Sequence, residues 1–189
     1  MFQGMRWLNE PPRWSVEGDV LLATTGLKTD FWRRTFYDFV RDDGHFYYQE
    51  VTGDFTAQVT LGGAYRELYD QSGLMVRADE TTWAKTGIEF TDGVAHLSAV
   101  FTRDYSDWSV LALPDFAGEL TLRVTRHADA LRVQYLRQDG VWQLLRLGYL
   151  PLPVTCQVGV MCCSPQREGF EARFRQFSVS APIARDLHT

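Results

Sequence analysis

The sequence predicts an all-β protein in which two antiparallel sheets pack face to face as a sandwich. Turn-forming residues recur about every 8 to 15 positions along the chain of 189 residues, and no stretch has the period of a convincing amphipathic helix. Several stretches alternate polar and apolar residues, as antiparallel strands with one buried and one wet face do. So many short strands are compatible with a sandwich or a barrel, and we favour two packed sheets, one of them curved. We expect residues 1–189 to form one domain.

Each expected strand is an alternating or apolar run between turn signals. Leu120, Leu122 and Val124, for example, alternate with polar neighbours. The final strand is expected to return and pair near the start of the chain, as in a jelly roll. In chain order, the expected strands span residues 20–24, 46–49, 54–61, 71–77, 83–90, 96–102, 108–112, 119–125, 130–136, 142–147, 155–163 and 171–180.

The pair Asp92-Gly93 predicts a tight hairpin between strands 83–90 and 96–102. A type I′ turn needs positive φ at both central residues, which Asp-Gly supplies. This turn fixes the register, so that one face is apolar and the other carries an acid, an imidazole, an ammonium and an indole. The expected pairs on the polar face are Glu89 with His96, Gly87 with Ser98, Lys85 with Val100, and Trp83 with Thr102.

Strand 71–77 extends the same polar face. A five-residue link to strand 83–90 would place Gln71 opposite Glu89 and Gly73 opposite Gly87. Gly73, Gly87 and Ser98 then form a strip with almost no side-chain volume, flanked by polar groups. We interpret the strip as a ligand groove, because glycine within a strand indicates close approach by a ligand or another backbone. The alternative is that a loop or sheet edge packs there. An open groove would accept Gly87→Val with little loss of stability.

Aromatic residues make up 14% of the chain and are dense in segment 31–39. This segment would either rim the groove or plug an open end of the sandwich. We favour the plug for Phe36 and Phe39, and contact with a ligand for Trp32. Asp107 and Trp108 follow a turn after strand 96–102 and are expected at the mouth of the groove, or simply at the end of that turn.

Glu89 and His96 are the candidate catalytic residues, because a carboxylate beside an imidazole forms a general acid/base pair. The alternative is an ordinary cross-strand ion pair. Lys85 would donate a hydrogen bond to a ligand or neutralise Glu89. The sequence lacks nucleophile-elbow, phosphate-loop, dinucleotide and metal-ligand spacings. We therefore expect no cofactor and no metal, since the four histidines are scattered at His45, His96, His127 and His188.

The net charge of −5, with both signs interspersed, gives no electrostatic surface for nucleic acid or an anionic membrane. The N-terminus lacks the features of a signal peptide, and no apolar stretch is long enough to span a bilayer. Three cysteines, two of them adjacent at Cys162-Cys163, favour buried reduced thiols over disulfides. We expect a cytoplasmic protein.

Five motifs follow one another along the chain, namely Thr29-Asp30-Phe31-Trp32, Asp70-Gln71-x-Gly73-Leu74, Trp83-x-Lys85-x-Gly87-x-Glu89-Phe90, His96-Leu97-Ser98 and Ser106-Asp107-Trp108. In this order they resemble the motifs of an uncharacterised family with the concanavalin A-like lectin/glucanase fold, which includes a yeast protein named for regulation of enolase. The resemblance covers roughly residues 7–179 and implies a two-sheet jelly roll whose related lectins and glucanases bind sugars on a concave face. It implies no reaction, because the paired carboxylates of the related glucanases have no counterpart here.

Three functions follow as hypotheses. The first is a binding protein that holds a small carbohydrate or sugar-like metabolite in the groove. The second is an enzyme of unknown class that uses Glu89 and His96, and the third is a regulatory module that binds another protein through this face. The expected ligand contacts are Trp32, Gln71, Trp83, Lys85, Glu89, His96, Ser98, Asp107 and Trp108.

Overall fold

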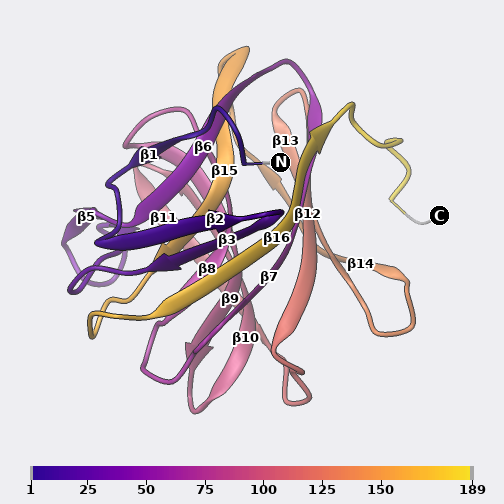
Figure 1. The fold of residues 1–189 in the computed structure, drawn as a ribbon. Helices are drawn as coiled ribbons and strands as arrows, with labels where there is room; N and C mark the ends of the chain where they lie inside the picture. Colours follow the sequence, from indigo (N-terminus) through magenta and orange to yellow (C-terminus); the bar gives the residue numbers. More distant parts are fainter. Residues whose placement is uncertain (1, 188–189) are drawn as a thin grey trace.

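The computed structural model describes residues 2–187 and consists of two seven-stranded antiparallel sheets and a two-stranded ribbon, without any helix in that range (Figure 1). Sheet A has the order β1 (Arg6–Leu8), β6 (His45–Thr52), β15 (Thr155–Cys163), β8 (Gln71–Arg77), β9 (Thr82–Thr91), β10 (Val94–Arg103) and β11 (Tyr105–Ala112). Sheet B has the order β14 (Trp142–Tyr149), β13 (Ala130–Leu136), β12 (Glu119–His127), β7 (Phe55–Gly63), β16 (Glu171–Ser180), β3 (Val20–Thr24) and β2 (Arg13–Glu17). The ribbon pairs β4 (Phe31–Arg33) with β5 (Val40–Asp42).

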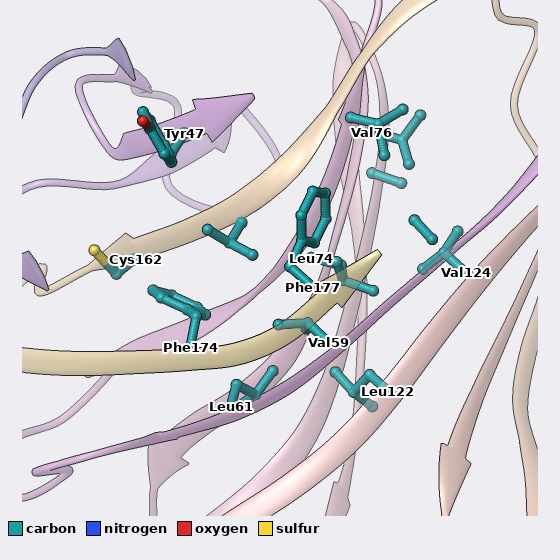
Figure 2. Packing of buried hydrophobic residues seen from close by; sticks show 14 of the residues in the cluster. Tyr47, Val59, Leu61, Leu74, Val76, Leu122, Val124, Cys162, Phe174 and Phe177 are labelled. Carbon is teal, nitrogen blue, oxygen red and sulfur yellow. The ribbon is translucent and has the colours of Figure 1, made fainter. Parts of the chain in front are cut away.

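The main core lies between the two sheets, as the alternation of the strands predicts. Leu74 and Val76 of β8 pack in one cluster with Val59 of β7 and with Leu122 and Val124 of β12 (Figure 2). All five side chains are almost completely buried. The two-sheet sandwich predicted from the sequence is thus confirmed.

Most expected strands are present within a few residues of their predicted bounds. The final strand β16 pairs with both β3 and β7, so the predicted return to the start of the chain is confirmed. Four short strands were not predicted, namely β1, β2, β4 and β5. The first two lie at sheet edges and the others form the ribbon, so none of them needs the long alternation by which the central strands are recognised.

The predicted register of the central hairpin is also confirmed. Asp92 and Gly93 have φ angles of 53° and 78°, and Thr91 pairs with Val94. Glu89 lies opposite His96, and Gln71 lies opposite Glu89 on the other side. The outer face of sheet A therefore carries the polar residues that the sequence placed together.

The glycine strip has a different cause from the one predicted. A Cβ on Gly87 would lie 1.9 Å from the carbonyl oxygen of Ser72, and a Cβ on Gly73 would lie 2.0 Å from that of Thr86. The backbones of β8 and β9 thus approach too closely for any side chain at these two positions. The expectation that Gly87→Val would be tolerated was wrong, because valine would collide with backbone atoms that cannot move aside.

The ribbon covers the outer face of sheet A and forms a second, smaller core. Phe31 packs against Trp83, and Met75 and Val100 belong to the same buried cluster. Two ion pairs attach the ribbon to the rest of the protein, Arg77 with Asp42 of β5 at 2.7 Å and Arg33 of β4 with Asp104 at 2.9 Å. The ribbon is therefore held at both of its strands.

Candidate functional site

A cavity of about 410 Å³ lies between the outer face of sheet A and the residues that surround the ribbon. Its floor comes from the central strands and its walls from the ribbon and three neighbouring segments. The lining residues are Lys28, Asp30, Trp32, Tyr37, Phe39, Arg41, Tyr69, Gln71, Lys85, Glu89, Val100, Trp108, Pro165 and Gln166. This lining combines aromatic rings with a few convergent polar groups, which is typical of a small-molecule site.

Most of the charges that line a second hollow, of about 620 Å³ over sheet B, already form ion pairs. Glu119 forms ion pairs with Arg173 and Arg175, and Arg137 pairs with Asp139. These groups are satisfied without a ligand. The cavity over sheet A is therefore the stronger candidate for a binding site.

Lys85 is a buried cation in the floor of the cavity. Its Nζ donates to Oδ1 of Asp30 at 3.0 Å, and the two side chains are only 6% and 16% exposed. Burial alone would lower the pKa of Lys85, but the negative charge of Asp30, together with smaller contributions from Cys163 and Glu89, outweighs this effect and the pKa is raised. The lysine is therefore a fixed positive charge with its own counterion.

Glu89 is the other buried charge, and its surroundings differ from those of Lys85. One of its carboxylate oxygens accepts a hydrogen bond from Nε1 of Trp108 at 3.1 Å, and the same indole also donates to Oγ of Ser98. Glu89 is 6% exposed, and across residues 2–187 no cationic nitrogen lies within ion-pair distance of it. Burial raises the pKa of Glu89, although the charge of Lys85 offsets part of this effect.

The walls are built from aromatic rings set edge to face. The rings of Trp32 and Trp108 have centroids 6.4 Å apart and planes 89° apart, and Tyr69 meets Trp108 at 78°. Tyr37 meets Trp32 at 69° and stacks on Phe39. These rings line the same cavity as Glu89.

Two tyrosines connect opposite walls of the cavity. The hydroxyl groups of Tyr37 and Tyr69 lie 3.3 Å apart. This hydrogen bond, together with burial, raises the pKa of Tyr69 to about 12, so the phenol stays neutral at physiological pH. Lys28, Tyr69 and Phe36 all have positive φ angles, and backbone strain of this kind clusters at functional sites.

A buried ion pair fixes two other walls relative to each other. Asp70 is fully buried, and its carboxylate accepts hydrogen bonds from Arg167 and from the backbone amides of Arg66 and Glu67. Asp70 precedes Gln71 on one wall, and Arg167 follows Gln166 on the other. The pair therefore positions the lining residues on both sides of it.

The structure places five of the nine expected ligand contacts in the cavity and four outside it. Trp83 is fully buried beneath the ribbon against Phe31, and Asp107 points away to Arg146 of β14 at 3.1 Å. Ser98 is occupied by the indole of Trp108, and His96 does not line the cavity. The five residues that line the cavity are Trp32, Gln71, Lys85, Glu89 and Trp108.

Glu89 and His96 lie opposite each other in the sheet, but their side chains diverge. Nδ1 of His96 lies 3.2 Å from the carbonyl oxygen of Val94, whereas Glu89 bonds to Trp108. No hydrogen bond or ion pair joins Glu89 to His96 anywhere in the described residues. The expected contact between them is therefore wrong, because each side chain finds a partner in a different direction along the strands.

Sequence reasoning missed several lining residues that lie outside the central strands. Tyr37 and Phe39 belong to the aromatic segment that was expected either to rim the groove or to plug the sandwich, and Phe39 was assigned to the plug. In the structure Tyr37 and Phe39 line the cavity, and Phe36 is 90% exposed. The expectation that Phe36 and Phe39 plug the sandwich is therefore wrong. Asp30 stood in a recognised motif, but only the fold shows that it pairs with Lys85.

Burial limits the chemistry that the three cysteine thiols can take part in. Cys156, Cys162 and Cys163 are free and buried, as expected, and burial raises the pKa of Cys162 to about 12. Within residues 2–187, no group of three His, Cys, Asp or Glu side chains is arranged to hold a metal ion. His188 lies outside the described residues. The same range holds no helix that could cross a membrane.

Comparison with known proteins finds one family and several structural neighbours. The model of a family described as protein of unknown function (DUF1349) matches residues 7–182. "Regulation of enolase protein 1" of Saccharomyces cerevisiae is 44% identical over 182 residues, which cover 96% of this chain and 92% of that protein. A crystal structure of a functionally unknown protein from the same yeast has a TM-score of 0.93 at 43% identity and covers 97% of this chain and 99% of that one.

More distant structures share only the fold. The carbohydrate-binding module CBM66 from Bacillus subtilis has a TM-score of 0.61 at 12% identity and covers 94% of this chain and 98% of that one. The GH43 protein BlXynB from Bacillus licheniformis has a TM-score of 0.67 at 16% identity, and the match covers 91% of this chain but 35% of that protein. The resemblance seen in the sequence motifs, and the jelly-roll fold that it implied, are thus confirmed.

Proposed function

Because this chain belongs to the DUF1349 family of proteins of unknown function, we propose from its own site that it is a cytoplasmic protein that binds a small carbohydrate or sugar-like metabolite in the cavity over sheet A. The observation that carries the proposal is the lining, in which aromatic rings surround a polar floor within one cavity. Sugars are bound in this way, because their apolar faces pack on rings while hydroxyl groups bond to fixed polar side chains.

The polar floor suits hydroxyl groups. Gln71 offers both a donor and an acceptor, Glu89 offers an acceptor, and Lys85 offers the ammonium hydrogens that Asp30 leaves free. The volume of about 410 Å³ is in the range of small-molecule sites. A carbohydrate-binding module is among the proteins that share this fold, and this likeness, which extends to the fold alone, supports the proposal.

The proposal is tested by titrating the protein with a panel of monosaccharides and following saturation-transfer NMR and tryptophan fluorescence. We expect binding to change the emission of Trp32 and Trp108 and to be lost in Trp32→Ala and Trp108→Ala. The matched control is Trp142→Ala, since Trp142 stacks on Arg123 over sheet B, away from the cavity. If no sugar in the panel binds, or if Trp142→Ala weakens binding as much as Trp108→Ala, the carbohydrate proposal fails.

A second candidate function is regulation through contact with another protein on the same face. Phe36 favours it, because this large apolar side chain is 90% exposed at the tip of the ribbon. Phe36→Ser should then abolish the protein contact and leave sugar titrations unchanged. The enzyme hypothesis receives no comparable support, since it depended on a contact between Glu89 and His96.

A further inference from the structure

The interior of the cavity carries one more negative charge than positive. Lys85 forms its ion pair with Asp30 at 3.0 Å. Within residues 2–187 the carboxylate of Glu89 therefore has no cation at ion-pair distance, although the more distant charge of Lys85 still favours its ionised form. Lys28 and Arg41 also line the cavity, but both are exposed, and Arg41 pairs with Asp43. A buried carboxylate without a cation is costly, so the site is electrostatically incomplete as it stands.

Glu89 lines the cavity, and no hydrogen bond within the described residues reaches one of its two carboxylate oxygens. Its other oxygen accepts from Nε1 of Trp108 at 3.1 Å, and the residue is 6% exposed and belongs to the lining. On the neighbouring strands, Gln71 and His96 stand opposite it without donating to it. Within the described chain, the carboxylate thus has room for one strong donor that comes from the cavity.

The aromatic rings that line the cavity together with Glu89 form a box and not a flat platform. Trp32 and Trp108 are almost perpendicular, and Tyr69 and Tyr37 close two further sides through edge-to-face contacts. The electron-rich faces of such rings attract cations, and boxes of this kind hold ammonium groups. A stacked sugar ring alone would need only one or two of these walls.

We propose that the cavity binds an ammonium group between the aromatic box and the free carboxylate oxygen of Glu89, so that its ligand is an amino sugar or a related small polar amine. This inference rests on the proposed function and narrows its ligand class. The ammonium group supplies the counterion that Glu89 lacks, and the rest of the ligand occupies the floor near Gln71 and Lys85.

Isothermal titration with D-glucosamine, D-glucose and choline at pH 7 tests the inference. The two sugars differ by one amino group in place of a hydroxyl group, and choline carries a quaternary ammonium without a sugar. We expect glucosamine to bind at least about tenfold more tightly than glucose, because cation–π attraction and a charged hydrogen bond both add to its affinity.

The variants locate this preference at Glu89. Glu89→Gln keeps the shape of the side chain and its bond to Trp108, and it should reduce glucosamine affinity to that of glucose. Glu89→Asp keeps the charge and should retain part of the preference. Glu171→Gln, an exposed position on β16, serves as the control and should change nothing. Melting curves confirm that each variant is folded.

The outcomes separate this inference from the proposed function. Equal binding of both sugars, unchanged in Glu89→Gln, would overturn the ammonium site and leave a carbohydrate site standing. Binding of choline alone, lost in Glu89→Gln, would support the ammonium site and overturn the carbohydrate proposal. Failure of all three probes to bind at millimolar concentration would overturn both.

Discussion

On the face of sheet A that meets sheet B, Ile88 and Leu97 are buried by apolar neighbours, whereas on the opposite face Lys85 and Glu89 are buried almost as completely beneath the ribbon. The exposed fractions are 1% and 0% on the inner face and 5% and 6% on the outer face. The same two strands, β9 and β10, contribute to both faces. The burial is therefore alike while the chemistry differs.

Burial affects stability differently on the two faces. The inner face gains roughly 25 cal/mol for each Å² of apolar surface removed from water, and it needs no specific partner. The outer face loses the hydration of two charges, and each loss must be offset by a counterion or hydrogen bonds. Lys85 has Asp30 for this purpose. Within the described residues Glu89 has no such ion pair, and it is stabilised by the more distant charge of Lys85 and by the polar groups of Ser98 and Trp108. Buried charges with perturbed pKa values cluster at functional sites.

The largest loss of stability is expected at Gly87, where the backbones of β8 and β9 approach each other closely. Gly87→Val should prevent stable folding or cost more than about 3 kcal/mol, because its Cβ alone would lie 1.9 Å from the carbonyl oxygen of Ser72. Urea denaturation followed by circular dichroism measures the loss. Ser178→Val, which adds a branched side chain at an exposed position of β16, should change stability little. A Gly87→Val protein as stable as this control would contradict the close approach of β8 and β9.

A smaller loss of stability is expected when the ion pair between Lys85 and Asp30 is broken. Asp30→Asn should cost about 3 kcal/mol, since it leaves the ammonium of Lys85 buried without its counterion. The matched control is Asp139→Asn, which breaks an ion pair with Arg137 whose side chains are about half exposed, and it should cost less than about 1 kcal/mol. Similar losses in both variants, measured by chemical denaturation, would show that Lys85 does not depend on Asp30.

Removing the unpaired charge of Glu89 should increase the stability of the protein. Glu89→Gln is expected to raise the melting temperature of the ligand-free protein by a few degrees at pH 7. Burial raises the folded-state pKa of Glu89 above its ordinary value of 4.5, so the stability that its protonated form contributes is present at acid pH and is lost as the pH rises through that pKa.

The gain in Glu89→Gln should therefore shrink as the pH falls and disappear below about pH 4.5, where the wild-type carboxyl is protonated in both states. Melting curves of both proteins across this pH range measure this difference in stability. A Glu89→Gln protein that is less stable than wild type at pH 7 would mean that the carboxylate has a counterion after all.

The smallest effect concerns the hydrogen bond across the mouth of the cavity. Tyr37→Phe should change stability by less than about 1 kcal/mol, because the bond is partly exposed to water. It should also lower the pKa of Tyr69 from about 12, since the bond to Tyr37 is the largest cause of that shift. NMR titration of labelled tyrosine measures it. An unchanged pKa would show that the hydroxyl groups are not bonded in solution.

The central strands could be predicted from the sequence because their pattern is local. Alternation and the Asp92-Gly93 turn determine both the facing and the register of β9 and β10, and the structure confirms them. The walls of the cavity could not be predicted in the same way. Asp30 and Tyr69 reach the site through loops whose paths no periodic pattern describes.

Even within the correct register, side-chain directions remained open. The sequence places Glu89 beside His96, but the indole of Trp108, one strand further along the sheet, provides a hydrogen bond that draws Glu89 toward it. Gly73 and Gly87 mark a close approach, as their place within strands predicts, but the approaching atoms belong to the neighbouring strand and not to a ligand.

The strand order of the two sheets also determines when the chain can fold during synthesis. β15 lies between β6 and β8 in sheet A, and β16 lies between β7 and β3 in sheet B (Figure 1). Until residues 155–180 leave the ribosome, both sheets are split and four strands have unpaired edges. Such long-range pairing is slow and leaves edges open to aggregation. The nascent protein should therefore depend on chaperones until its last strands emerge.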